Sequence, residues 1–209
     1  PSIAAGSSQL YLLAVSIKKS GAAIDSVSGG GLDWIERPTP EACSGRDQIK
    51  VAIYSAFGSP GAAFTPAVTF SEKVEGAAAV LVRCSGAQKT FDDSQKANTT
   101  GQPGKCSGGT DNSKPTIKAT VAVAGSYVFV ATGTRLQTIT TKDADYTERG
   151  VAVGGSSGGT ARVYAHDRNN APAGQDTIGH TISSDVDWAM VALVVRSATT
   201  GGATISAPV

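Results

Sequence analysis

Apolar and polar positions along this chain follow the two-residue period of β-strands rather than the 3.6-residue period of helices. Gln48–Ser55 alternates cleanly between isoleucine or valine and other residues, which is typical of a half-buried strand. Gln9–Lys18 and Asp187–Arg196 are apolar at nearly every interior position, so strands there would be covered on both faces. No helical apolar period persists through a window of about 15 residues. We therefore predict an all-β protein.

Gly, Pro, Asn and Asp clusters punctuate the chain into about eleven short strands, spaced roughly 8–12 residues apart as in sandwiches and barrels. Pro66 removes a ladder donor from the predicted strand Phe64–Ser71, which places that strand at a sheet edge. Residues 85–115 are rich in Gly, Ser, Asn, Asp and Lys. We predict that they form the longest irregular segment, and loops longer than about 15 residues tend to be functional or mobile.

The 209 residues show no internal repeat and no interdomain linker, and a chain of this length can bury roughly 70% of its unfolded surface in one core. We predict one antiparallel β-sandwich over residues 1–197, followed by a C-terminal tail over 198–209. Charged residues make up only 17% and the net charge is +1. No basic stripe for nucleic acid is visible, and no apolar run approaches the ~20 residues of a membrane span. The start of the chain has no charged region followed by an apolar one, so we expect a secretory signal peptide to be absent or already removed.

Three cysteines, Cys43, Cys84 and Cys106, are each followed by Ser-Gly. None lies in a C-x-x-C motif or near a histidine, so no zinc site is predicted from them. Cys84 ends an apolar strand and Cys106 lies in a polar loop, and this pair is our disulfide candidate. Its loop of about 20 residues would contribute ~3 kcal/mol in an entropic model. Three free thiols are the alternative, whereas a disulfide would indicate a compartment outside the cytosol.

Five segments, in order, resemble a jelly-roll type of β-sandwich found in secreted bacterial surface proteins and in phage structural proteins. They are residues 10–17 (LYLLAVSI), 24–32 (IDSVSGGGL), 49–54 (IKVAIY), 79–86 (AVLVRCSG) and 187–190 (DWAM). The resemblance covers most of the chain and implies a building or adhesion module. It brings no catalytic residues with it.

The two ends of the chain depart from that pattern. Such domains open with an extra strand before the first buried one, yet only residues 1–8 precede Gln9. Past the closing strand, by contrast, the tail holds a segment that can itself be extended, Ala203, Thr204, Ile205, Ser206 and Ala207. A vacant sheet edge and a spare strand indicate β-addition between subunits, a heterologous contact that builds filaments unless it closes into a ring. The alternative is that both ends are mobile or pair within one molecule.

Catalytic motifs are weak. Residues 154–158 (GGSSG) match the G-x-S-x-G nucleophile elbow, which requires a strand-to-helix turn, but two predicted strands flank them and favour a hairpin. The only histidines, His166 and His180, lie in predicted strands with Asp167 and Asp176 nearby in sequence. A base oriented by a carboxylate is conceivable, but no nucleophile accompanies them, so we expect strand-face histidines hydrogen-bonded to neighbours. We predict no catalytic residue, no enzymatic activity and no cofactor.

Candidate ligand sites are equally sparse. Asp167, Asn169, Asn170 and Asp176, or the pair Asp143 and Asp145, offer oxygens to Ca²⁺ but lack the spacing of a dedicated calcium loop. Because Asx side chains commonly hydrogen-bond within turns, we predict no metal site there. Residues 98–100 (NTT) form a glycosylation sequon in the predicted loop.

Aromatic residues leave two interpretations open. Trp34 and Trp188 adjoin apolar strands, which favours a place in the core. The alternative is a sugar-stacking platform assisted by exposed tyrosines such as Tyr54, Tyr146 and Tyr164.

From these patterns we predict a non-enzymatic structural subunit of an extracellular filament or a virion surface, which joins copies of itself through β-strand edges. The alternative function is a lectin-like module that binds surface glycans. The expected location is the extracellular space, the cell surface or the virion surface, with neither nucleic acid nor a membrane span involved.

Overall fold

The computed structural model describes residues 2–19, 21–38, 41–43, 48–102, 106, 111–198 and 204–206, and the side chains of 42, 43 and 204–206 lie outside that description. The described chain contains strands β1–β17, all paired antiparallel, one short 3-10 helix and no α-helix. The prediction of an all-β protein is confirmed, although the strands are more numerous than the eleven expected. No helix in this part of the chain is long and apolar enough to cross a membrane.

Two large sheets form the centre of the molecule. The first sheet has the order β17-β7-β1-β5-β3, with β4 also on β5, and the second sheet has the order β12-β13-β10-β16-β8. In that order, the strands of the first sheet are β17 (Thr204–Ser206), β7 (Gly76–Ser85), β1 (Gln9–Lys18), β5 (Ile49–Gly58), β3 (Ile35–Glu36) and β4 (Glu41–Cys43). Those of the second sheet are β12 (Thr147–Gly154), β13 (Ala161–Ala171), β10 (Ser126–Thr134), β16 (Ala189–Ser197) and β8 (Ala87–Asn98).

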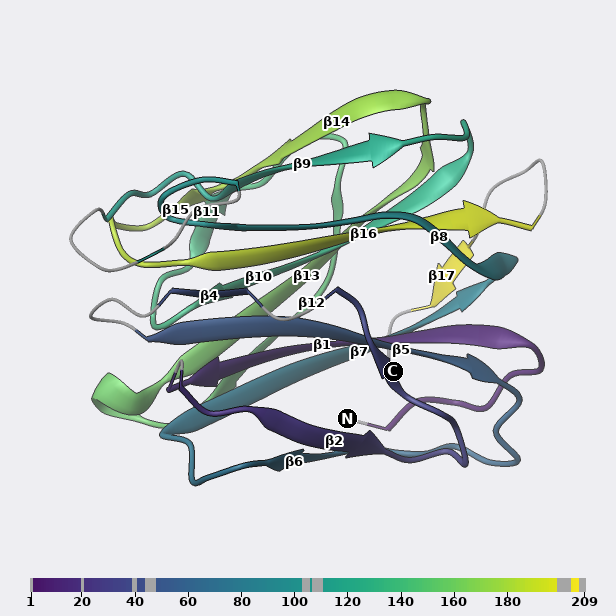
Figure 1. Cartoon of the computed structure of the whole chain (residues 1–209), viewed down its shortest axis with the longest axis horizontal. Coiled ribbons are helices and arrows are strands. Elements are labelled where there is room, and N and C mark those ends of the chain that lie inside the picture. The colour runs from purple at the N-terminus through teal and green to yellow at the C-terminus, as the bar shows by residue number, and fades with distance from the viewer. Residues whose placement is uncertain are drawn as a thin grey trace.

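Three two-stranded ribbons cover the outer faces, so that the strands stack in four layers (Figure 1). The ribbons are β2 (Ile24–Ser28) with β6 (Ala67–Phe70), β9 (Thr116–Val121) with β14 (Gly174–Gly179), and β11 (Ile139–Thr141) with β15 (Thr181–Ile182). The β2–β6 ribbon lies outside the first sheet, and the other two lie outside the second sheet.

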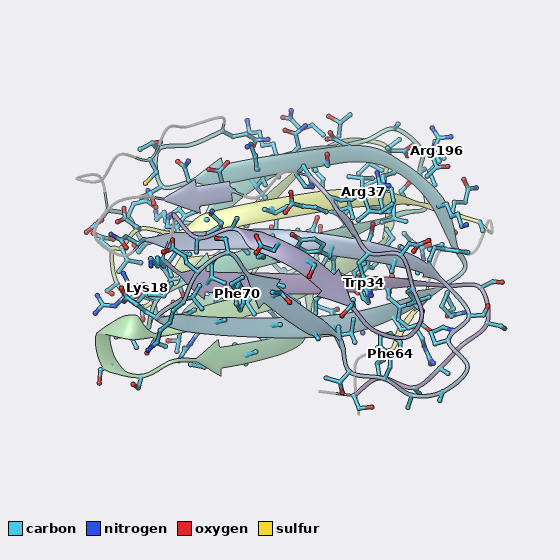
Figure 2. All side chains as sticks on the ribbon, turned by 60° about the horizontal axis from the view of Figure 1, so that its bottom comes forward. Lys18, Trp34, Arg37, Phe64, Phe70 and Arg196 are labelled. Atoms are coloured by element: carbon cyan, nitrogen blue, oxygen red, sulfur yellow. The ribbon has the colours of Figure 1, made fainter. Side chains whose placement is uncertain are left out.

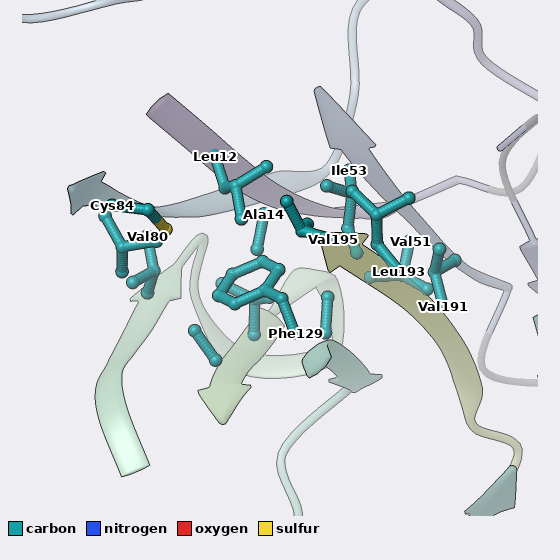
Figure 3. Packing of buried hydrophobic residues seen from close by; sticks show 14 of the residues in the cluster. Leu12, Ala14, Val51, Ile53, Val80, Cys84, Phe129, Val191, Leu193 and Val195 are labelled. Atoms are coloured by element: carbon teal, nitrogen blue, oxygen red, sulfur yellow. The ribbon is translucent and has the colours of Figure 1, made fainter. Parts of the chain in front are cut away.

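The core between the two sheets is built from alternate residues of their central strands. Leu12 of β1, Ile53 of β5, Phe129 of β10 and Leu193 of β16 meet there without exposure to solvent (Figure 3). The intervening residues of the same strands point the other way, because successive side chains of a strand alternate between faces. This core therefore accounts for only half of the apolar positions in each central strand.

Outer cores account for the other half. Tyr11, Leu13 and Val15 of β1 pack beneath the β2–β6 ribbon, where Trp34 and Phe64 also lie (Figure 2). On the far side, the second sheet buries a matching set beneath the β9–β14 and β11–β15 ribbons: Val128, Val130, Met190, Ala192 and Val194. Gln9–Lys18 and the closing apolar run are thus covered on both faces, as predicted.

The predicted loop over residues 85–115 is wrong in its first half. Residues 87–98 form β8, a twelve-residue strand at the edge of the second sheet that pairs with β16. The strand is mostly polar because much of it is only half-buried, and its register shifts in two places. Such a strand carries neither an apolar run nor a clean alternation for the sequence to reveal.

The connection between β12 and β13 packs tightly against the first sheet. A Cβ atom on Gly154 would lie 1.7 Å from the Ala77 carbonyl oxygen, and one on Gly76 would lie 2.2 Å from the carbonyl oxygen of Gly159. Both obstacles are backbone atoms, so no side-chain rotation can relieve them. These glycines are required for the close approach of the two sheets at this corner.

Replacing Gly154 with alanine should therefore lower the free energy of unfolding by more than about 3 kcal/mol or prevent folding, because overpacking against a backbone atom is costly. Gly21→Ala is the matched control, since no described atom beyond its chain neighbours lies within 4 Å of its added Cβ. Urea denaturation of both variants measures the difference. Equal stability of the two would contradict the close approach.

Candidate functional site

Residues 154–158 run from the last residue of β12 into the 3-10 helix Ser157–Gly159, which precedes β13. This is a link between two strands, as predicted, and not the strand-to-helix turn that a nucleophile elbow requires. The glycines of the G-x-S-x-G match are explained by the packing described above.

His166 and His180 come together on the outer side of the second sheet, and we call them the histidine pair. Their ring centroids are 4.5 Å apart with the planes tilted by 34°, and both side chains are buried. His166 lies in β13, paired with Val130 of β10 and Glu148 of β12. His180 lies between β14 and β15 rather than in a strand, contrary to prediction. The fold thus joins two positions that the sequence separates.

None of the four ring nitrogens of the histidine pair has a hydrogen-bond partner among the described residues, so the expectation of histidines bonded to neighbours is not met there. Burial lowers the pKa of His166 to about 3, and the nearby His180 and Lys142 act in the same direction. Burial also lowers the pKa of His180 to about 4, against the opposing effect of Asp143. Both rings are therefore neutral near pH 7 and keep an unused lone pair.

Asp167 cannot serve as a carboxylate partner of the histidine pair. Its carboxylate accepts hydrogen bonds from the Tyr127 hydroxyl at 3.0 Å and from the Arg149 Nε at 2.7 Å. Burial raises the pKa of Asp167, while Arg149 and then Tyr127 oppose that rise. Tyr127 belongs to the core between the sheets. Asp167 therefore faces that core, while His166, the residue before it in β13, faces the outer side of the sheet.

The remaining carboxylates considered for calcium are engaged within the protein, two of them by an arginine and one by backbone N–H groups. Arg168 pairs with Asp145 at 2.9 Å and with Asp176 at 3.1 Å, and Asp176 also accepts the Tyr146 hydroxyl at 2.8 Å. Asp143 accepts the backbone N–H of Asp145 at 3.1 Å. Asn169 and Asn170 are exposed near the end of β13. The calcium candidates are thus dispersed among separate contacts.

The glycosylation sequon is engaged in the structure. Asn98 ends β8 and is buried; its Nδ2 donates to the Glu41 Oε1 at 3.0 Å, and its Oδ1 accepts from Thr100. The expectation of a sequon in an open loop is therefore wrong. An amide that is buried and bonded on both sides is inaccessible to glycosylation in the folded chain.

The tryptophans have different surroundings. Trp188 is buried, and its Nε1 donates to the Asn112 Oδ1 at 2.9 Å, so its predicted place in the core is confirmed. Trp34 is half-buried, meets Phe64 edge-to-face at 6.5 Å between centroids and donates to the Gly29 carbonyl (Figure 2). The tyrosines expected to be exposed are all buried, namely Tyr54, Tyr146 and Tyr164.

The predicted disulfide between Cys84 and Cys106 does not form. Cys84 is a free thiol in the core between the sheets, where burial raises its pKa. Cys106 is disulfide-bonded, so its partner is not Cys84. The side chain of Cys43 lies outside the described part of the chain.

The tail segment proposed for assembly lies against its own chain. Thr204, Ile205 and Ser206 form β17, which pairs with residues 83–85 of β7, and Ala203 and Ala207 lie outside the described residues. This agrees with the alternative that the tail pairs within one molecule.

The second sheet has two unlike edges. β8 is irregular in register, and its Asp92 pairs with Arg196. β12 is regular from Gly150 onward, and no strand among the described residues pairs with its outer side. Val151 and Val153 of β12 are 48% and 53% exposed. The sequence showed these valines as strand residues but gave no sign that they lie at an open edge.

A polar groove of about 350 Å³ lies between the edges of the two sheets, beside β3 and β8. The Arg37 guanidinium lies over the Phe91 ring at 4.7 Å, and Glu36 and Asp92 also line the groove. Figure 2 shows Arg37 and Arg196 on the same flank of the molecule. The sequence placed no candidate residue in this groove.

Comparison of this chain with protein-family models, with curated proteins and with solved structures finds no match.

The buried ion pair beside the inter-sheet core gives a stability prediction. Replacing Arg149 with methionine leaves the Asp167 carboxylate without its counter-charge and should cost about 3 kcal/mol. Lys19→Met breaks the exposed pair with Glu72 and should cost less than about 1 kcal/mol. Chemical denaturation at pH 7 compares the two variants, and equal losses would contradict a structural role for the buried pair.

Proposed function

We propose that this chain is a structural subunit of an extracellular filament or a virion surface, and that copies join through sheet edges. The open outer side of β12 is the observation that carries this proposal. The resemblance of five segments to jelly-roll domains of surface and phage structural proteins supports the same role. No catalytic step is part of the proposal.

An open edge strand carries unpaired N–H and C=O groups and can accept another strand. Natural proteins block such edges with charges, bulges or short strands, and β8 at the opposite edge has both a charged side chain and shifts in register. The regular part of β12, residues 150–154, has neither a charged side chain nor a shift in register. It presents Val151 and Val153 to solvent instead. A strand from a second copy would satisfy the backbone groups and bury part of both valines, each worth up to about 1.5–3 kcal/mol when fully buried.

The first sheet supplies a second route to assembly. β17 makes only three residue pairs with β7, so the tail of one copy could make the same pairs on a neighbour. Such an exchange is heterologous and propagates as a filament or a closed ring. The two routes use different sheets and can be separated by mutation.

Sedimentation velocity and negative-stain microscopy test the β12 route. The wild type should form oligomers or filaments as its concentration rises, whereas Val151→Lys with Val153→Lys should remain monomeric, because edge lysines block strand addition. Val123→Lys is the matched control, since Val123 is 47% exposed but lies outside any strand. A wild type that stays monomeric throughout would overturn the assembly function.

Deleting residues 198–209 tests the tail route in the same assay. If exchange of β17 joins the copies, the shortened chain should remain folded by circular dichroism but fail to assemble, while the double lysine variant still assembles. Assembly that survives the deletion and is lost in the lysine variant assigns the contact to β12 alone.

Glycan binding is the second candidate function, and the groove beside β3 and β8 is the observation that favours it. Its charged side chains offer both donors and acceptors to sugar hydroxyls. A glycan array should show binding by the wild type and loss with Arg37→Ala, and Lys19→Met serves as a control because Lys19 does not line the groove. Absence of wild-type binding removes this candidate. Trp34 is unsuitable as a probe because its ring packs on Phe64.

A further inference from the structure

The histidine pair brings together two buried side chains of a type that binds metals, and the partly exposed carboxylate of Glu148 lies beside them. We propose that His166, His180 and Glu148 form a binding site for a divalent first-row transition-metal ion such as Zn²⁺. Two histidines and one carboxylate are an established ligand set for zinc. This proposal does not rest on the proposed assembly function.

The first support is the unused hydrogen-bonding capacity of the pair. A neutral imidazole has one N–H donor and one acceptor lone pair, and a buried polar group without a partner is costly. Here none of the four ring nitrogens forms a hydrogen bond with any residue that the structure describes, and the ring centroids are 4.5 Å apart. An ion that accepts a lone pair from each ring would satisfy two of these four nitrogens, whereas the two remaining N–H groups would still need an acceptor such as a buried water.

The second support is the position of Glu148. Its Oε2 lies 3.7 Å from the His166 Nε2, which is too long for a hydrogen bond. Two ligands bound to one zinc ion at about 2.0–2.1 Å each are separated by roughly 3–3.6 Å, so a small movement brings this pair into range. The Glu148 side chain is 42% exposed and can therefore rotate toward the rings.

The charges around the pair are compatible with a cation. Asp143 acts electrostatically on His180 and hydrogen-bonds the Gly179 N–H through Oδ2, so a second carboxylate adjoins the site. Lys142 is a nearby cation that lowers the pKa of His166. As the side chains stand, no three ligand groups of the described chain are gathered around a common point. Rotation of Glu148 is therefore the step that closes the site.

Titration of metal-free protein with Zn²⁺, followed by calorimetry and thermal unfolding, tests the proposal. We expect one ion per chain and a rise in Tm, because a ligand that binds only the folded state stabilises it. His166→Ala and His180→Ala should each weaken binding at least tenfold, and Glu148→Gln should also weaken it. Asp145→Asn is the matched control because that carboxylate faces Arg168, and its affinity should stay within twofold of the wild type.

A second measurement needs no substitution. The chain has only two histidines, so its proton NMR spectrum contains two sets of imidazole signals. Both sets should shift together on addition of one equivalent of Zn²⁺. Unshifted imidazole signals, as expected if only water bridges the rings, would overturn the site, and so would zinc binding that survives replacement of both histidines.

Discussion

Burial of both faces of β1, β10 and β16 is the constraint on which the rest of the structure depends. An antiparallel sheet usually leaves one face to solvent, yet each of these strands is buried along almost its whole length. One face is covered by the opposite sheet, and the other by a two-stranded ribbon. The four-layer arrangement follows, because two layers alone would leave Tyr11, Leu13 and their counterparts in water.

The sequence reveals these strands and hides some of the strands around them. Gln9–Lys18 was predicted with the same bounds as β1, because a continuous apolar run has no other place in a β-protein than between two covering layers. β8 was not predicted as a strand because Lys89, Asp92 and Asp93 interrupt any apolar period. Its place at the edge of the sheet comes from its pairing with β16 and not from its own composition. β4 has only three residues, too few for a period to be visible.

The candidate site was beyond sequence reasoning for a related reason. His166 and Asp167 are adjacent in the chain, yet strand alternation sends one to the histidine pair and the other to Arg149 and Tyr127. His166 instead meets His180, which the β13–β14 turn returns to the same face. The two histidines thus come together through strand pairing and the alternation of side chains along β13. A motif of adjacent residues in the sequence contains neither kind of information.

The open edge and the histidine pair share one strand. β12 places Glu148 opposite His166, and three residues later places Val151 opposite Tyr164. A shift in register separates these two positions, between Glu148 and Gly150. Binding of Glu148 to an ion would restrain the β12 backbone next to this shift in register. The regular segment that follows the shift carries Val151 and Val153. Because a backbone held in place loses less entropy when another strand adds to it, an ion at Glu148 would favour the proposed strand addition at Val151 and Val153.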